Sequence, residues 1–144
     1  MTDILEERTV FGGILVRVKH ASDACQCEMT LSVFTPDTST PAKDLPVLFY
    51  CSGLTCNDTN AVTKGGAFET AAELGVALVF PDTSPRGCGI TGEDESYDFG
   101  TGASFYLDAT KAPWDKNYNM YSYVSVELPV FLEKRFGLLA RECA

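Results

Sequence analysis

The chain has 144 residues, of which 45% are hydrophobic and 22% charged, and its formal net charge is −9 at pH 7. This length suits one domain with a buried core. The acidic charge excludes nucleic acid and anionic lipid as expected partners, because both are bound through clustered Lys and Arg. No apolar run is long enough to span a bilayer, so no membrane partner is expected.

The six cysteines raise the question of disulfides or a metal site. The N-terminal segment places acids where a secretory signal needs a basic and then an apolar stretch, so a cytoplasmic chain with reduced thiols is expected. Cys25 and Cys27 are closer in sequence than the zinc ligand pairs that roughly two to four residues separate. The other cysteines are scattered and His20 is the only histidine, so no metal site is expected. No cofactor is expected either.

The first third of the chain predicts antiparallel strands. One strand is expected to follow the two glycines of the segment FGG at 11–13. Apolar and polar residues then alternate over residues 25–34, which is typical of a half-buried strand. On this pattern Cys25 and Cys27 face the core. Residues 36–46 are polar and rich in proline, which indicates a connection.

The middle of the chain predicts a βαβ unit. Residues 46–51 and 76–82 are apolar without alternation, as in strands covered on both faces by helices, and the first of them should be central. Residues 60–74 predict a helix that ends against Gly75, a residue suited to a left-handed helix terminus. Parallel strands joined through a helix indicate the α/β fold class.

Residues 83–116 form a long segment rich in Gly, Asp and Ser. Its aromatic residues can bury enough area to order it, and long ordered loops tend to carry function. The acidic stretch at 93–95 is interpreted as a solvated face, because it lacks the spacing of a calcium loop.

The last predicted element is a helix over residues 119–136. Asn119 is in position to cap its start, and Gly137 follows its end. Pro129 lies inside the helix, where a missing N–H and a bulky ring are unfavourable, so a bend is expected there.

Several motifs, in order along nearly the whole chain, resemble the S-formylglutathione hydrolase (esterase D) family. They are FGG at 11–13, SGLTC at 52–56, PDTSPRG at 81–87, GEDESYDFG at 92–100, FYLDAT at 105–110, PW at 113–114, MYSYV at 120–124 and ELP at 127–129. The resemblance implies an α/β-hydrolase fold and a serine thioesterase and carboxylesterase. Members hydrolyse S-formylglutathione to glutathione and formate, in formaldehyde detoxification, with a Ser-Asp-His triad. A glutathione thioester is therefore the expected substrate. The sequence leaves open whether the protein forms a homodimer.

The serine nucleophile of this fold lies in a G-x-S-x-G turn, and Asp and then His follow it along the chain. The sequence contains no such motif: Ser104 follows Gly102, but Tyr106 stands where the second glycine is needed. In the family the turn reads like GHSMGG, a few residues beyond the equivalent of Arg141. Residues 1–144 are thus expected to be the N-terminal portion of one α/β-hydrolase domain, truncated before the nucleophile and inactive alone.

One catalytic element is expected in the segment SGLTC at 52–56. Acyl transfer uses two N–H donors to stabilise the oxyanion, and one of them comes from a loop after an earlier strand. This segment leaves the strand predicted over residues 46–51 at its carboxyl end, where open α/β sheets place their sites. The resemblance implies that the Leu54 N–H is the donor, and Gly53 allows close approach of the backbone to a ligand.

Other residues are expected nearby in supporting roles. Cys56 is expected to line the acyl pocket, since no histidine is available to activate it as a nucleophile. Arg86 and Trp114 are expected to shape the glutathione pocket, because their loops lie near the site. Ser52 and Ser84 lack both the glycines of the turn and a base, and they are interpreted as ordinary hydroxyls.

A second hypothesis comes from a different class of function. In this hypothesis, the chain is a catalytically dead short product that binds or regulates the full-length enzyme. Strands that are central in a whole domain become edges in a shorter one, and uncovered edges invite pairing with another chain.

Overall fold

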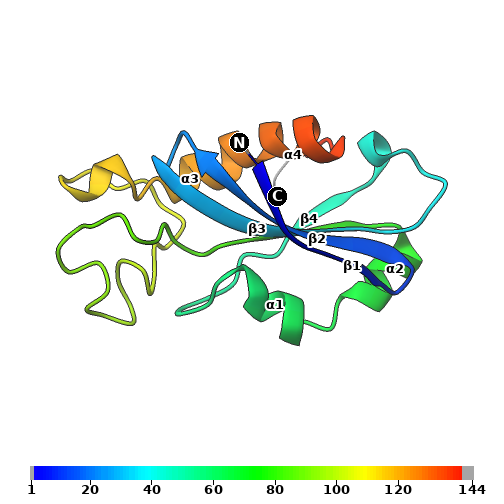
Figure 1. Cartoon of the computed structure of the whole chain (residues 1–144), viewed down its shortest axis with the longest axis horizontal. Coiled ribbons are helices and arrows are strands. Elements are labelled where there is room, and N and C mark those ends of the chain that lie inside the picture. Colours follow the sequence, from blue (N-terminus) through cyan, green and yellow to red (C-terminus); the bar gives the residue numbers. More distant parts are fainter. Residues whose placement is uncertain (1, 141–144) are drawn as a thin grey trace.

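The computed structural model describes residues 2–140 (Figure 1). Within this range the strands form a mixed sheet in the order β1-β2-β3-β5-β4. The strands are β1 Thr2–Val10, β2 Gly13–Ser22, β3 Cys27–Thr35, β4 Val47–Phe49 and β5 Ala77–Pro81. The first three strands and β5 pair antiparallel in that order, whereas β4 and β5 run parallel. The predicted antiparallel start and βαβ unit are both confirmed.

The turn between β1 and β2 shows why two glycines stand at 12 and 13. Gly12 has a φ of +80°, a left-handed conformation that favours glycine. A Cβ on Gly13 would lie 2.6 Å from both the ring of Phe34 and the carbonyl oxygen of Thr35. The acidic N-terminal residues that precede this turn form β1, an exposed strand for which the sequence pattern gave no signal.

The prediction that residues 46–51 form a central strand is wrong for the described residues. Strand β4 has a single neighbour, β5, and the side chain of Leu48 is 53% exposed. Of the two parallel strands, β5 is the one with neighbours on both sides, and its five residues are all buried. Apolar composition alone does not distinguish these positions in a sheet, because both strands can pack against helices.

The helical prediction for residues 60–74 is confirmed in outline, but the segment is divided in two. Helix α1 spans Asp58–Lys64 and α2 spans Phe68–Leu74. The break falls at the glycine pair, where Gly66 has a φ of +62°. Gly75 closes α2 in the predicted left-handed conformation, with a φ of +65°.

The last helical segment has a wide turn in its middle. It consists of α3 Met120–Ser122, the π-helical turn η3 Tyr123–Glu127 and α4 Leu128–Phe136. The Leu128 N–H donates to the carbonyl of Tyr123, five residues earlier. The irregularity therefore lies directly before Pro129, where a bend is predicted. In a regular α-helix the proline ring would press against the carbonyl four residues earlier, and the wide turn relieves this contact.

The start of this segment is capped from a distant loop. Asn119 makes no capping hydrogen bond with its side chain, contrary to the prediction. The carboxylate of Asp108 instead accepts hydrogen bonds from the N–H and the hydroxyl of Ser122, at 2.9 and 2.6 Å. Gly137 closes α4 with a φ of +69°, as predicted. Two short 3-10 helices, η1 Ala42–Asp44 and η2 Trp114–Lys116, lie in connections.

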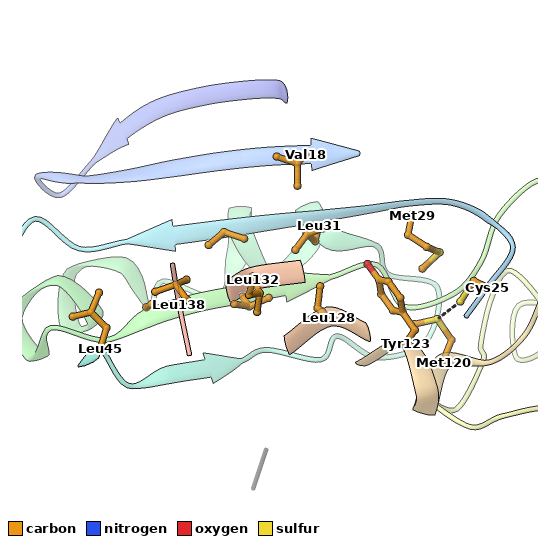
Figure 2. Close-up of a cluster of buried hydrophobic side chains, with 13 residues drawn as sticks. Val18, Cys25, Met29, Leu31, Leu45, Met120, Tyr123, Leu128, Leu132 and Leu138 are labelled. Atoms are coloured by element: carbon orange, nitrogen blue, oxygen red, sulfur yellow. Dashed lines mark hydrogen bonds between the residues drawn. The ribbon is translucent and has the colours of Figure 1, made fainter. Parts of the chain in front are cut away.

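Helices cover both faces of the sheet, so the fold has three layers (Figure 1). On one face, residues 120–138 pack on the sheet around Tyr123, Leu128 and Leu132, each with no exposed surface (Figure 2). On the other face, α1 and α2 pack on Phe34 and Phe80. Burial of both faces is what an α/β architecture requires, and the predicted fold class is confirmed. Arg141, the reference point for the expected nucleophile turn, lies outside the described residues.

His20 lies in β2 and packs against residues of the first of these cores. It is 5% exposed, its Nε2 is 3.0 Å from the hydroxyl of Tyr123, and its ring stacks on Phe131 at 4.2 Å. Burial lowers its pKa below the ordinary value near 6.5, and the negative charge of Glu127 opposes this shift in part.

This burial predicts a pH dependence of stability. Above about pH 6.5 the imidazole is neutral in both states, so its protonation contributes nothing. As the pH falls below that value, the unfolded state takes up the proton first, and stability is lost until the pH reaches the lowered folded-state pKa. Proton NMR of the only histidine should therefore give a midpoint below 6.5. A midpoint at or above 6.5 would contradict the buried placement.

Candidate active site

The loop at residues 52–56 follows β4 at the carboxyl end of the parallel pair. The Tyr50 N–H makes the last ladder bond, to the carbonyl of Val79 at 2.8 Å. The loop then turns tightly: the Cys56 N–H donates to the carbonyl of Gly53 at 3.3 Å, and Thr55 has a φ of +62°. Within residues 2–140, no hydrogen bond uses the N–H of Leu54 as a donor. This N–H is therefore a candidate donor to a ligand.

A cavity of about 300 Å³ lies against this loop, and its walls are almost wholly apolar. Its lining comes from three segments: Ser52, Gly53, Leu54, Thr83, Ala103, Ser104, Phe105 and Tyr106. A Cβ on Gly53 would meet no atom within 4 Å, so packing does not require glycine there. The loop after β4 and the loop at 103–106 thus form the two sides of one hollow.

Arg86 does not line this cavity but holds the loop from outside. Its Nε and Nη2 donate to the carboxylate of Asp82 at 2.9 and 2.8 Å, and its Nη2 also donates to the carbonyl of Cys56 at 2.9 Å. The hydroxyl of Thr83 donates to the same carbonyl. The paired carboxylate fixes the guanidinium in the fork geometry that arginine favours.

Trp114 lies in η2, beside a second cavity of about 220 Å³. Its ring packs edge-on against Phe99 and Tyr118, with centroids 4.7 and 4.8 Å apart. The second cavity shares the wall at residues 103–105 with the first. The aromatic residues that predict an ordered loop thus form part of its internal packing.

Cys56 is partly exposed and lies on the outer side of the loop. It lines a shallow hollow together with Tyr50, Asn60 and Lys64, and Ser52 and Gly53 line both this hollow and the apolar cavity. The thiol is therefore near the candidate oxyanion donor without belonging to the lining of the larger cavity.

Two serines near the cavity, Ser104 and Ser84, are paired with backbone carbonyls. The hydroxyl of Ser104 donates to the carbonyl of Thr83 at 2.6 Å, and that of Ser84 donates to Gly100 at 3.1 Å. His20 lies in the core beneath α4, in contact with Tyr123. Neither serine has the hydrogen-bonded base that an activated nucleophile requires.

Two buried carboxylates, Asp58 and Asp82, lie beside the loop on the side of the sheet. Sequence patterns did not predict the burial of either. Asp58, the first residue of α1, has no exposed surface and accepts from the Nε and Nη2 of Arg17 at 2.6 and 2.9 Å. The hydroxyl of Thr30 lies 3.4 Å from Asp58 and 3.3 Å from Asp82, so it links this pair to the Arg86 pair. Only the fold brings these residues together.

The interpretation of the acidic stretch at 93–95 as a solvated face is wrong for Glu93. This residue is 5% exposed, and its carboxylate accepts hydrogen bonds from the N–H groups of Cys88 and Gly89 and from the hydroxyl of Tyr118. The two acids after it are exposed. Glu93 orders the long loop from within, since a buried carboxylate needs such donors.

Two kinds of site are absent from the part of the chain that the structure describes. Within residues 2–140, no three side chains of His, Cys, Asp or Glu converge as metal ligands. In the same range, no helix has the length and hydropathy needed to cross a membrane.

The sheet order, the helix-covered faces and the loop after β4 define an α/β-hydrolase fold. A family model described as "Putative esterase" matches residues 22–144. S-formylglutathione hydrolase of Arabidopsis thaliana is 48% identical over 130 residues, which are 90% of this chain and 45% of the relative. The Rattus norvegicus enzyme of the same name is 46% identical over 126 residues, which are 88% and 44%. The chain belongs to this esterase family and is similar to the N-terminal part of S-formylglutathione hydrolases.

Solved structures support the same assignment. The structure of an S-formylglutathione hydrolase from Agrobacterium tumefaciens superimposes with a TM-score of 0.88 at 42% identity, over 94% of this chain and 49% of that one. A fluorophosphonate-binding serine hydrolase from Staphylococcus aureus, at 17% identity and a TM-score of 0.63 over 88% of this chain and 42% of that one, supports the fold alone. The chain spans less than half the length of the curated relatives that it matches.

The buried ion pair behind the loop predicts a large stability effect. Asp58→Ala leaves the Arg17 guanidinium without its partner, which should cost about 3 kcal/mol, the low end for a broken buried pair because Arg17 is partly exposed. The matched control is Glu28→Ala, which breaks the exposed pair with Lys19 and should change stability little. Urea unfolding measures both. Equal losses for the two variants would contradict the assigned role of Asp58.

Proposed function

We propose that the protein is a serine thioesterase and carboxylesterase that hydrolyses S-formylglutathione to glutathione and formate, and that its loop at residues 52–56 supplies one oxyanion donor. The observation that carries this proposal is the Leu54 N–H, which has no acceptor among residues 2–140 and belongs to a residue that lines an apolar cavity. The names of the similar enzymes support the substrate. A cytoplasmic location with reduced thiols is part of the same proposal.

The chemistry explains why such a donor matters. When a nucleophile adds to a thioester carbonyl, the carbonyl oxygen gains a negative charge. An N–H group that is already fixed in place stabilises this charge without reorganising during the reaction. Apolar walls such as Phe105 and Leu54 strengthen the interaction, because they lower the local dielectric.

The supporting residues follow from this placement. Gly53 leaves space beside the loop, and Trp114 packs in the wall of the neighbouring cavity, where the glutathione part of the substrate would extend. Arg86 and Cys56 do not line the apolar cavity. Arg86 donates to the carbonyl of Cys56, and Cys56 lines the neighbouring hollow. No cofactor is needed for this hydrolysis.

A hybrid enzyme tests the proposed function. Residues 2–140 replace the matching segment of the Agrobacterium tumefaciens enzyme, whose backbone is closely similar at a TM-score of 0.88. The hybrid should hydrolyse S-formylglutathione. Leu54→Pro removes the N–H and should lower kcat by roughly 10²–10³-fold, the usual effect of losing one oxyanion donor. Leu54→Ala keeps the N–H and should lose far less. Similar decreases of kcat in both variants would contradict the assignment of the Leu54 N–H as an oxyanion donor.

We also propose that the 144-residue chain alone is inactive. Its only histidine is buried beneath α4, so among the described residues no histidine lines the cavity as a general base. Hydrolysis of S-formylglutathione or p-nitrophenyl acetate by the purified chain should not exceed that of its Cys56→Ala variant. Turnover above this control would show that these residues contain a complete site.

The free edge of β4 favours one second candidate, a catalytically dead chain that pairs with a full-length enzyme. Among the described residues β4 pairs with β5 alone, and Leu48 and Leu74 are exposed beside it. Exposed apolar edges invite pairing with another chain. Co-purification of the chain with an active full-length enzyme, lost in Leu48→Lys, would favour this candidate.

A further inference from the structure

Three residues other than glycine adopt left-handed backbone conformations around the cavity. Thr55 has a φ of +62°, and the consecutive residues Phe105 and Tyr106 have φ values of +58° and +52°. Residues with a Cβ rarely adopt this conformation, and it persists only where the surroundings hold it in place. Such residues lie on both sides of the same cavity, which indicates that the surrounding contacts hold the backbone of this site in a fixed geometry.

The strained pair places the Tyr106 side chain against the start of the oxyanion loop. Its hydroxyl donates to the carbonyl of Ser52 at 2.7 Å. Burial raises the pKa of Tyr106 well above its ordinary value, so the hydroxyl stays protonated and keeps donating. A backbone bond, from the Thr55 N–H to the carbonyl of Gly102 at 2.8 Å, joins the same two segments.

The far end of the loop is held by Arg86. Its Nη2 donates to the carbonyl of Cys56 at 2.9 Å, and its two bonds to Asp82 keep it in place at the end of β5. The two anchored carbonyls belong to residues 52 and 56, and Leu54 lies midway between them. A peptide fixed on both sides keeps the direction of its N–H, and small errors in such a direction are costly in catalysis.

We propose that Tyr106 and Arg86 are positioning residues, which hold the two ends of the loop and thereby fix the direction of the Leu54 N–H. Neither side chain contacts the oxyanion in this assignment. The inference rests on the proposed function of the loop, and it assigns to Arg86 a role in catalysis through the backbone.

The test uses two variants of the hybrid enzyme. Tyr106→Phe keeps the ring in the cavity wall and removes only the donor. Arg86→Lys keeps the charge but cannot bond Asp82 twice and the Cys56 carbonyl at once. Each should lower kcat roughly tenfold, less than direct loss of an oxyanion donor, and leave KM within about twofold. The matched controls Tyr121→Phe and Arg135→Lys alter exposed side chains and should leave both constants unchanged.

A second readout separates positioning from general structural damage. Phenylboronic acid forms a tetrahedral adduct with an active-site serine and thereby mimics the charged intermediate. Its inhibition constant should rise by the same factor as kcat falls, while the melting temperature stays well above the assay temperature. If one variant does not fold, the other decides, because it acts on the opposite end of the loop.

The outcomes distinguish the two proposals. An active parent hybrid with kcat within twofold in both variants, or with KM raised as much as kcat is lowered, overturns this inference alone. An inactive parent hybrid overturns the proposed function and this inference together.

Discussion

The structure depends on the burial of a single strand, β5. All five of its residues are buried, it pairs with β3 on one side and β4 on the other, and its side chains enter both cores. Because β5 fixes the register of β4, it also fixes where the loop at residues 52–56 leaves the sheet. Because β5 ends at Pro81, it places Asp82 at the carboxyl edge, where the polar groups of the site collect. One apolar segment thus orients the layers and the candidate site together.

The polar layer at this edge connects the antiparallel part of the sheet to the loop. Asp58 and Asp82 are both buried, and each accepts hydrogen bonds from its own arginine. The partner of Asp58 is Arg17 in β2, and the partner of Asp82 is Arg86 in the loop that follows β5. The Thr30 hydroxyl bridges them from β3. Such pairs contribute little net stability when they form, but breaking one leaves an uncompensated buried charge. The main effect of the network is therefore to hold these segments in one geometry. Arg86 joins the loop after β4 to this network, because its Nη2 also donates to the carbonyl of Cys56.

Sequence patterns anticipated the elements whose signals are local. The buried run at 76–82, the left-handed glycines that close two helices and the loop at 52–56 are each encoded within a few residues. What the sequence alone did not predict depends on distant contacts: the edge position of β4, the burial of Glu93, and the capping of Ser122 by Asp108. An acid in a polar run is solvated by default, and only the donors that surround Glu93 in space reverse that expectation.

The π-helical turn before Pro129 sets the rotation of everything that follows it. Inward residues run 120, 123, 128 and 132, and the five-residue step lies where the wide turn adds one residue to the helix. Each residue of an α-helix turns the chain by about 100°. In a regular α-helix of the same sequence, five residues would turn the chain by about 500°, so Leu128 would point about 140° away from the direction of Tyr123. The wide turn compensates for one extra residue, and it lets both Tyr123 and the two leucines that follow it face the sheet.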